Sequence, residues 1–141
     1  MIFLMCCFMI KKEQHLQVLE SEIRKTVSDG KIKVEVVLRP KSAQVGESIS
    51  LDIYVHTVLG IDINTSVINS IGDFVIIEKS YSGGGNSDGE FYSGRHFELE
   101  APKSGRYRIP SFDIYYTDTT NEHLISSKHI TTRSFGYIVH E

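Results

Sequence analysis

The stretch Ile49-Ser50-Leu51-Asp52-Ile53-Tyr54-Val55 decides the fold class of this chain. Apolar residues occupy every second position, and polar residues or tyrosine fill the positions between them. A period of two places these two sets on opposite faces of a β-strand. Leu51 and Ile53 are therefore predicted to face a core, and Asp52 is predicted to lie on a polar outer face. On this interpretation the replacement Asp52→Asn should have little effect on stability.

The same alternation continues on both sides of this strand, from Lys31 to the C-terminus. The predicted strands cover residues 32–39, 49–55, 61–71, 74–79, 91–100, 107–116, 123–132 and 135–140. About seven or eight short strands, separated by turn signals, are typical of an antiparallel β-sandwich. Pro110 should bend its strand or place it at a sheet edge because proline has no N–H to donate. The glycine-rich residues 82–89 are predicted to form a flexible loop.

An uncharged apolar run, MIFLMCCFMI, occupies residues 1–10 and contains both cysteines, Cys6 and Cys7. It is shorter than the roughly 20 residues needed to span a bilayer, and it lacks the basic start and small-residue cleavage site of a signal peptide. Three interpretations stay open: a shortened signal or anchor segment that contacts a membrane, a segment packed on the domain, and an artificial extension left by cloning. Exposed apolar residues would be sticky in water, so we expect this run to be covered by a membrane, a partner or the domain itself.

Residues 11–30 are predicted to form an amphipathic helix. Leu16, Leu19, Ile23 and Val27 recur at spacings of three and four, and Gly30 follows as a typical residue after a helix end. The helix would lie on the sheet, act as a spacer at a membrane, or form a coiled-coil seam. The predicted organisation is therefore an apolar leader at residues 1–10, a helix at 11–30 and a β-sandwich domain at 31–141.

Composition limits the classes of partner. The chain has 141 residues, of which 40% are hydrophobic and 23% charged, as expected for one globular domain. Its net charge is −3, and the charged residues are dispersed, so there is no basic stripe for a phosphate backbone. We expect no nucleic-acid partner.

None of the chemical motifs in the chain is complete. The glycine-rich segment lacks the Gly-Lys-Ser/Thr ending of a phosphate-binding loop, and Gly84 stands where the first carboxylate of a calcium loop containing Asn86, Asp88 and Glu90 would fall. No Gly-x-Ser-x-Gly elbow occurs. The histidines form no metal-binding motif along the chain, although strand pairing could still bring some of them together: His15, His56, His96, His123, His129 and His140. We therefore assign no catalytic residue, no cofactor and no metal ligand, and expect a protein that is not an enzyme.

Two segments carry a family resemblance. Residues 39–55, with Val45-Gly46-Glu47 before an alternating strand, resemble the opening strands of bacterial immunoglobulin-like domains. Residues 97–114, with Gly105-Arg-Tyr-Arg-Ile-Pro-Ser-Phe112, followed by residues 126–130, resemble the end of a BatD-type domain of the aerotolerance, or oxygen tolerance, family. The similarity covers residues 31–140. Family members are usually longer, with several such domains and a C-terminal membrane helix.

This resemblance implies a fold and a place of action. The fold would be an immunoglobulin-like sandwich without known catalysis of its own. The protein would belong to the bacterial cell envelope and work beside von Willebrand A-type proteins and a MoxR-type ATPase in stress tolerance. We therefore expect it to be membrane-associated, on the periplasmic or extracytoplasmic face, with a cytoplasmic location still open.

Tyrosines provide the candidate binding residues. The chain has seven tyrosines, and Tyr115 and Tyr116 are adjacent in a predicted strand, so one of them must point away from the core. Exposed tyrosine is favoured at interfaces. We predict an all-β, antiparallel immunoglobulin-like β-sandwich with a short N-terminal helix. Its predicted function is a non-enzymatic protein-interaction module that binds a protein partner or a second copy through this tyrosine pair. A carbohydrate- or ligand-binding sandwich is the alternative, and a small enzyme the third hypothesis.

Overall fold

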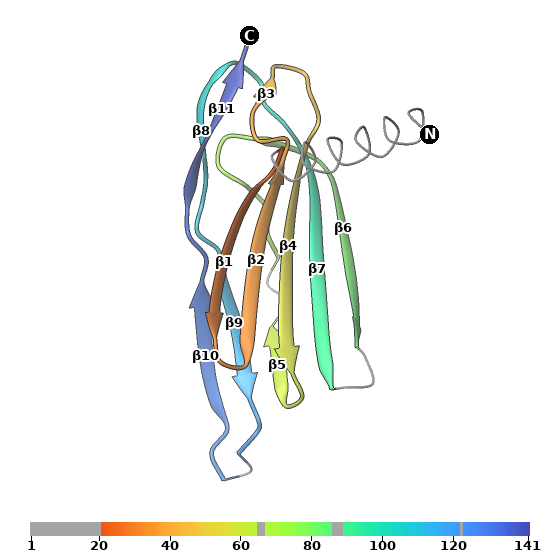
Figure 1. Ribbon diagram of the computed structural model, residues 1–141, viewed down its shortest axis with the longest axis vertical. Coiled ribbons are helices and arrows are strands. Elements are labelled where there is room, and N and C mark those ends of the chain that lie inside the picture. Colours follow the sequence, from red (N-terminus) through yellow and green to blue (C-terminus); the bar gives the residue numbers. More distant parts are fainter. Residues whose placement is uncertain (1–20, 65–66, 86–88, 122) are drawn as a thin grey trace, which may run out of the picture.

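The structure is a computed structural model that describes residues 21–64, 67–85, 89–121 and 123–141. These residues form β-strands and contain no helix, so the all-β prediction is confirmed (Figure 1). The strands are β1 (Ile23–Asp29), β2 (Ile32–Arg39), β3 (Ala43–Gln44), β4 (Ile49–Val58), β5 (Ile61–Asn64), β6 (Val75–Gly85), β7 (Glu90–Glu100), β8 (Gly105–Ile109), β9 (Asp113–Asp118), β10 (Ser126–Thr131) and β11 (Phe135–His140).

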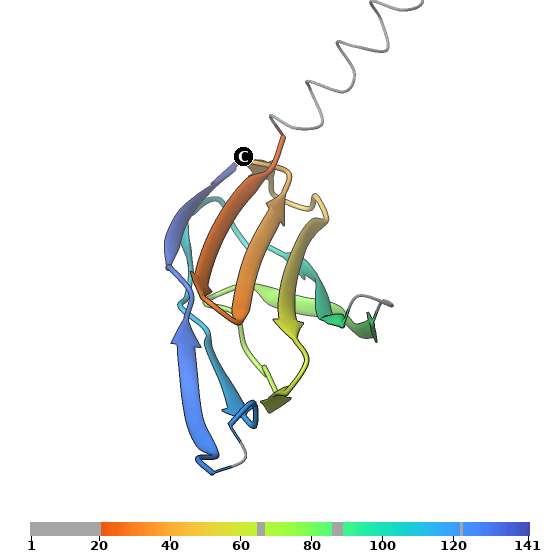
Figure 2. The same cartoon turned by 60° about the horizontal axis from the view of Figure 1, so that its bottom comes forward.

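The strands form two layers, as Figure 2 shows from below. One layer is a five-stranded antiparallel sheet with the order β1-β2-β4-β7-β6. The other consists of two three-stranded sheets, β10-β9-β5 and β3-β11-β8, and among their described strands only the short β3–β11 pair is parallel. This arrangement is a β-sandwich.

The second layer is divided because its two long strands are interrupted. Pro110 lies between β8 and β9, and residues 132–134 lie between β10 and β11. At each of these two breaks the chain passes from one three-stranded sheet to the other. The two crossings are joined, since the Phe112 N–H donates to Thr132 Oγ1 at 2.7 Å and the Thr132 N–H donates to the Phe112 carbonyl at 2.9 Å. Pro110 thus separates two strands where the sequence predicted one. Breaks of this kind help to explain why the described residues contain more strands than predicted.

The hydrophobic core lies between the layers. Leu51 and Ile53 of β4 are buried in it, as predicted from their alternation. Tyr107 of β8 is also buried, and its hydroxyl donates to the Lys103 carbonyl at 2.6 Å while accepting from the Lys103 N–H at 3.3 Å. Its ring stacks on Phe74 with centroids 4.5 Å apart. The aromatic ring therefore packs at the corner while its hydroxyl satisfies the backbone of Lys103.

The predicted helix over residues 11–30 is wrong for its last part, because Ile23–Asp29 forms β1. Ile23 and Val27 lie four positions apart, a spacing that places residues on one face of a helix and of a strand alike. They pair with Leu38 and Val34 of β2. Gly30, with φ 57°, is a turn residue of the β1–β2 hairpin and not a residue after a helix end. The sandwich therefore includes residues before Lys31; residues 1–20, with the apolar leader, lie outside the described residues.

The prediction of a loop over residues 82–89 is also corrected in part. Residues 82–85 belong to β6 and pair with β7. A Cβ atom on Gly85 would lie 2.7 Å from Phe91 Cδ1, and one on Gly84 would lie 3.2 Å from Tyr92 Cε1. The aromatic rings of β7 thus lean across the glycines and supply the packing that these residues lack. This contact explains a glycine run within a strand.

Candidate functional site

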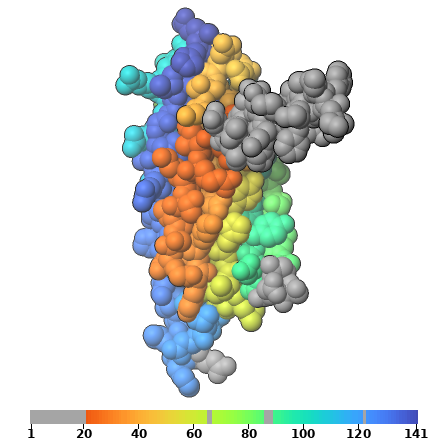
Figure 3. All heavy atoms as spheres, in the orientation of Figure 1, coloured from red at the N-terminus to blue at the C-terminus, as the bar shows by residue number. Residues whose placement is uncertain are grey.

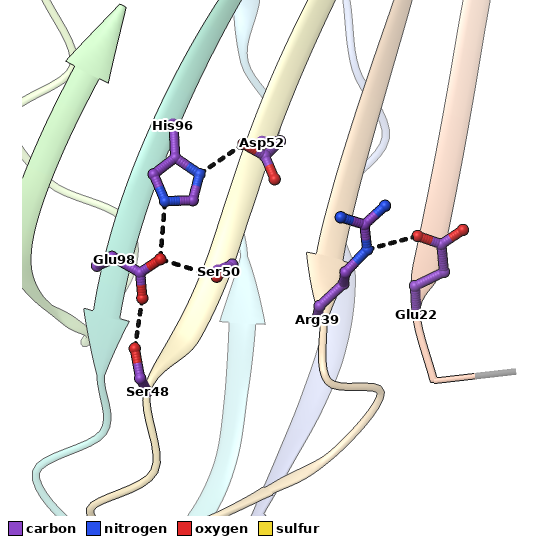
Figure 4. Close-up of polar contacts among 7 residues, drawn as sticks. All are labelled: Glu22, Arg39, Ser48, Ser50, Asp52, His96 and Glu98. Carbon is purple, nitrogen blue, oxygen red and sulfur yellow. Dashed lines mark hydrogen bonds and ion pairs between the residues drawn. The ribbon is translucent and has the colours of Figure 1, made fainter. Parts of the chain in front are cut away.

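A polar cluster on the outer face of the five-stranded sheet brings together residues far apart in the sequence. The β4–β7 register places Asp52 opposite His96 and Ser50 opposite Glu98. Because Leu51 and Phe97 point into the core, these four side chains share the outer face. Figure 3 shows this face of the molecule in front, and Figure 4 shows the cluster itself.

His96 lies at the centre of this cluster and contacts two carboxylates. Its Nδ1 is 2.6 Å from Asp52 Oδ1, and its Nε2 is 2.7 Å from Glu98 Oε1. Glu98 also accepts hydrogen bonds from Ser50 Oγ, at 2.9 Å, and from the Ser48 hydroxyl. The His96 side chain is 35% exposed, whereas that of Asp52 is only 11% exposed.

The two carboxylates favour the protonated imidazolium. Burial alone would lower the pKa of His96, but the hydrogen bonds to Asp52 and Glu98, together with their negative charges, outweigh it and raise the pKa above its usual 6.5. The hydrogen bond from Ser48 contributes most to a lowered pKa of Glu98, and Ser50 and His96 lower it further. The cluster is therefore a charged, mutually stabilised group.

This arrangement differs from that of a Ser-His-Asp catalytic triad. In a triad one imidazole nitrogen contacts the serine, whereas both nitrogens of His96 face carboxylates. Ser48 and Ser50 donate to Glu98 and not to the imidazole. The geometry stabilises a proton on His96 and positions neither serine for attack.

Ion pairs continue across the same face toward β1. Arg39 Nε donates to Glu22 Oε2 at 2.8 Å, and Arg24 pairs with Glu35 (Figure 4 shows the first of these). The arginine side chains are 43–45% exposed, so water screens the pairs and each contributes little to stability.

The predicted tyrosine pair lies on the opposite layer, in β9. Tyr116 points inward and is 3% exposed, and burial, with the nearby Asp29, raises its pKa. Tyr115 points outward and is 48% exposed. The prediction that one member faces away from the core is therefore confirmed, and Tyr115 is that member.

Tyr115 is surrounded by residues of both neighbouring strands. It lies opposite Asn64 of β5 and His129 of β10, and its ring centroid is 5.6 Å from that of His129. The remaining outward positions of these three strands are polar: Asp62, Asp113, Thr117, Ser127 and Thr131. We call the outer face of β10-β9-β5 around this ring the Tyr115 face.

The strand histidines do not assemble into a metal centre in the described part of the chain. Over these residues, no group of three or more His, Cys, Asp or Glu side chains is arranged to hold a metal ion. Asn86 and Asp88, considered as calcium ligands with Glu90, lie outside the described residues, as does His15.

Comparisons with protein-family models, with curated proteins and with solved structures found no match. In the described ranges, no helix is long and apolar enough to span a membrane.

Proposed function

We propose that this domain is a non-enzymatic protein-interaction module that binds a protein partner through the Tyr115 face. The observation that supports the proposal is the half-exposed ring of Tyr115, set among polar residues of three strands. Binding energy at interfaces concentrates in a few central aromatic or arginine side chains surrounded by a polar rim. The ring of His129 restricts the tyrosine from one side, which lowers the entropy lost on binding.

In this proposal the module works on the extracytoplasmic face of a bacterial membrane. The resemblance of residues 39–55 and 97–114 to BatD-type domains supports that location. It also supports von Willebrand A-type and MoxR-type proteins as partners in stress or oxygen tolerance. The same resemblance supports an immunoglobulin-like arrangement of the strands, which is part of this proposal.

The test measures binding of a purified von Willebrand A-type protein from the same genome by titration calorimetry. Tyr115→Ala should weaken binding by about 1–3 kcal/mol, the range for an aromatic interface residue. Ile138→Ala is the matched control, because Ile138 is 49% exposed but lies in β11, outside the three strands of the Tyr115 face. Equal affinity of the wild type and the Tyr115→Ala variant would refute the proposed face.

A second candidate function is favoured by the residues beside Tyr115. Asn64 lies directly opposite the ring, and Asp62 and Asp113 lie at neighbouring outward positions. An aromatic ring with amide and carboxylate groups beside it also suits a carbohydrate, which would stack on the ring and hydrogen-bond to those groups. Affinity electrophoresis in gels containing polysaccharide separates the two functions. Retardation that Tyr115→Ala abolishes would favour carbohydrate binding over the protein partner.

A further inference from the structure

Most sheet edges in the described chain are short or covered. β1 contacts β10 of the second layer, while β3 and β5 have only two and four residues. β8 is covered by residues 71–74, since a Cβ on Gly72 would lie 2.6 Å from the Arg108 carbonyl oxygen and Phe74 stacks on Tyr107. Natural proteins protect edges in these ways because unpaired backbone groups pair readily with another strand.

β6 is the exception. It has 11 residues, and among the described strands it pairs on one side only, with β7; it lies at the edge away from β9 and β10 (Figures 1 and 2). Every residue of β6 except Ile76 is exposed, including Ile77 and Tyr81 at 60% each. A β-bulge between Ile76 and Glu78 disturbs the start of the strand, but Glu78–Gly85 pairs regularly with β7 and contains no proline. This regular stretch is an open edge with few protective features.

We propose that β6 pairs antiparallel with β6 of a second copy of this chain, in a register centred on Tyr81. The two five-stranded sheets would then continue into each other around a two-fold axis. Such an interface is self-complementary, since each strand supplies the same surface to the other.

The side chains of β6 favour this register over those centred on Glu78, Lys79 or Ser80. Centring on Tyr81 places Ser80 opposite Ser82, Lys79 opposite Gly83 and Glu78 opposite Gly84. Each long charged side chain thus meets a glycine, and the two Tyr81 rings form a central cross-strand pair. Centring on Lys79 or on Glu78 would oppose like charges, which is destabilising. Centring on Ser80 would move the pairing closer to the bulge between Ile76 and Glu78, so that fewer regularly paired residues would face each other.

Tyr81 is also held in place for such a pair. It lies opposite Arg95 of β7, and the guanidinium carbon of Arg95 is 6.0 Å from the centre of its ring. This cation–π contact limits the motion of an otherwise exposed side chain. The charges, the glycines and the one aromatic residue of β6 therefore complement the same strand of a second copy.

The first experiment is sedimentation velocity of the full chain over a range of concentrations. The wild type should form a dimer, and Tyr81→Lys should weaken dimerisation by at least about tenfold by placing like charges at the two-fold axis. Ile138→Lys is the matched control, because Ile138 is 49% exposed but lies in β11 of the other layer. A wild type that stays monomeric, or association equally strong in both variants, would overturn the proposal.

The second experiment tests the register by disulfide cross-linking in a chain carrying Cys6→Ser and Cys7→Ser. Opposed residues of antiparallel strands have Cα atoms about 4.5–5.5 Å apart, within the range of a disulfide. Tyr81→Cys should therefore form a cross-linked dimer under oxidation, whereas Ser80→Cys should not. Cross-linking by Ser80→Cys alone, or by neither variant, would refute the register. Both experiments are independent of Tyr115, so their failure leaves the proposed function intact.

Discussion

The pair of carboxylates around His96 predicts stability that depends on pH. The folded-state pKa of His96 is raised above its usual 6.5. The stabilisation from the imidazolium is therefore fully present below about pH 6.5 and is lost as pH rises through the folded pKa. The replacement His96→Gln removes the charge and leaves only neutral hydrogen bonds from the glutamine amide to the carboxylates.

The size of the effect follows from the two contacts of 2.6 and 2.7 Å. A hydrogen bond to a charged group contributes about 1.5–3 kcal/mol when it is well buried. The His96 side chain is 35% exposed, so water screens both contacts. We therefore expect His96→Gln to lower the free energy of unfolding by about 1–2 kcal/mol in total at acidic pH, and by much less at alkaline pH.

The assay is urea denaturation followed by circular dichroism at about pH 5.5 and about pH 9, on either side of the titration. His56→Gln is the matched control, because His56 is exposed on the same face but lies outside the His96 cluster. The loss of unfolding free energy caused by His96→Gln should be larger at pH 5.5 than at pH 9, and at pH 5.5 it should exceed the loss caused by His56→Gln. An equal loss at both pH values would refute the reasoning that the imidazolium is stabilised.

The replacement Asp52→Asn should also change the pH dependence of stability, contrary to the prediction from the sequence. From the alternation alone this replacement should be nearly silent. In the structure the Asp52 side chain is 11% exposed and contacts His96, so losing its charge removes one of the two groups that stabilise the imidazolium. We expect Asp52→Asn to reduce the pH dependence without abolishing it, since Glu98 remains.

Two further predictions concern the core. Leu51→Asp should unfold the domain, because Leu51 is fully buried and an unpaired carboxylate there costs more than about 4 kcal/mol; a retained cooperative melt would contradict this. Tyr107→Phe should lower the free energy of unfolding by about 1–2 kcal/mol, since it leaves both backbone groups of Lys103 without the hydroxyl. Urea denaturation that gave the wild-type midpoint for this variant would show the corner hydrogen bonds to be dispensable.

The sequence predicted the architecture wherever one period dominates. Residues 49–55 alternate strictly, and their inward and outward faces agree with the structure. The helix predicted over residues 23–29 was wrong because the spacing of Ile23 and Val27 fits a helix and an alternating strand equally well. The loop predicted over the glycines of β6 was wrong for another reason. Their packing comes from Phe91 and Tyr92 of the neighbouring strand, and local sequence propensity does not include such contacts.

The candidate sites differ in how far the sequence could predict them. Tyr115 and Tyr116 are adjacent in one strand, so alternation alone requires one of them to point outward. The His96 cluster depends on the pairing of β4 with β7, which places Asp52 and His96 opposite each other although 44 positions separate them in the chain. The available signal was that both lie at polar positions of predicted strands; the missing information was the register between those strands.

The two proposed surfaces do not overlap, and the closure of the sandwich explains why. On the β1 side, Lys31 Nζ bridges the layers through Thr120 Oγ1 at 2.6 Å and Asp118 Oδ2 at 3.2 Å. These contacts close that side, which leaves the β6 edge for strand addition and the outer Tyr115 face for a partner. Two copies joined at β6 would therefore present two Tyr115 faces at once. A partner with two matching sites would then bind with an avidity about 10²–10⁴ above the single-site affinity, and Tyr81→Lys would remove this gain while leaving single-site binding unchanged.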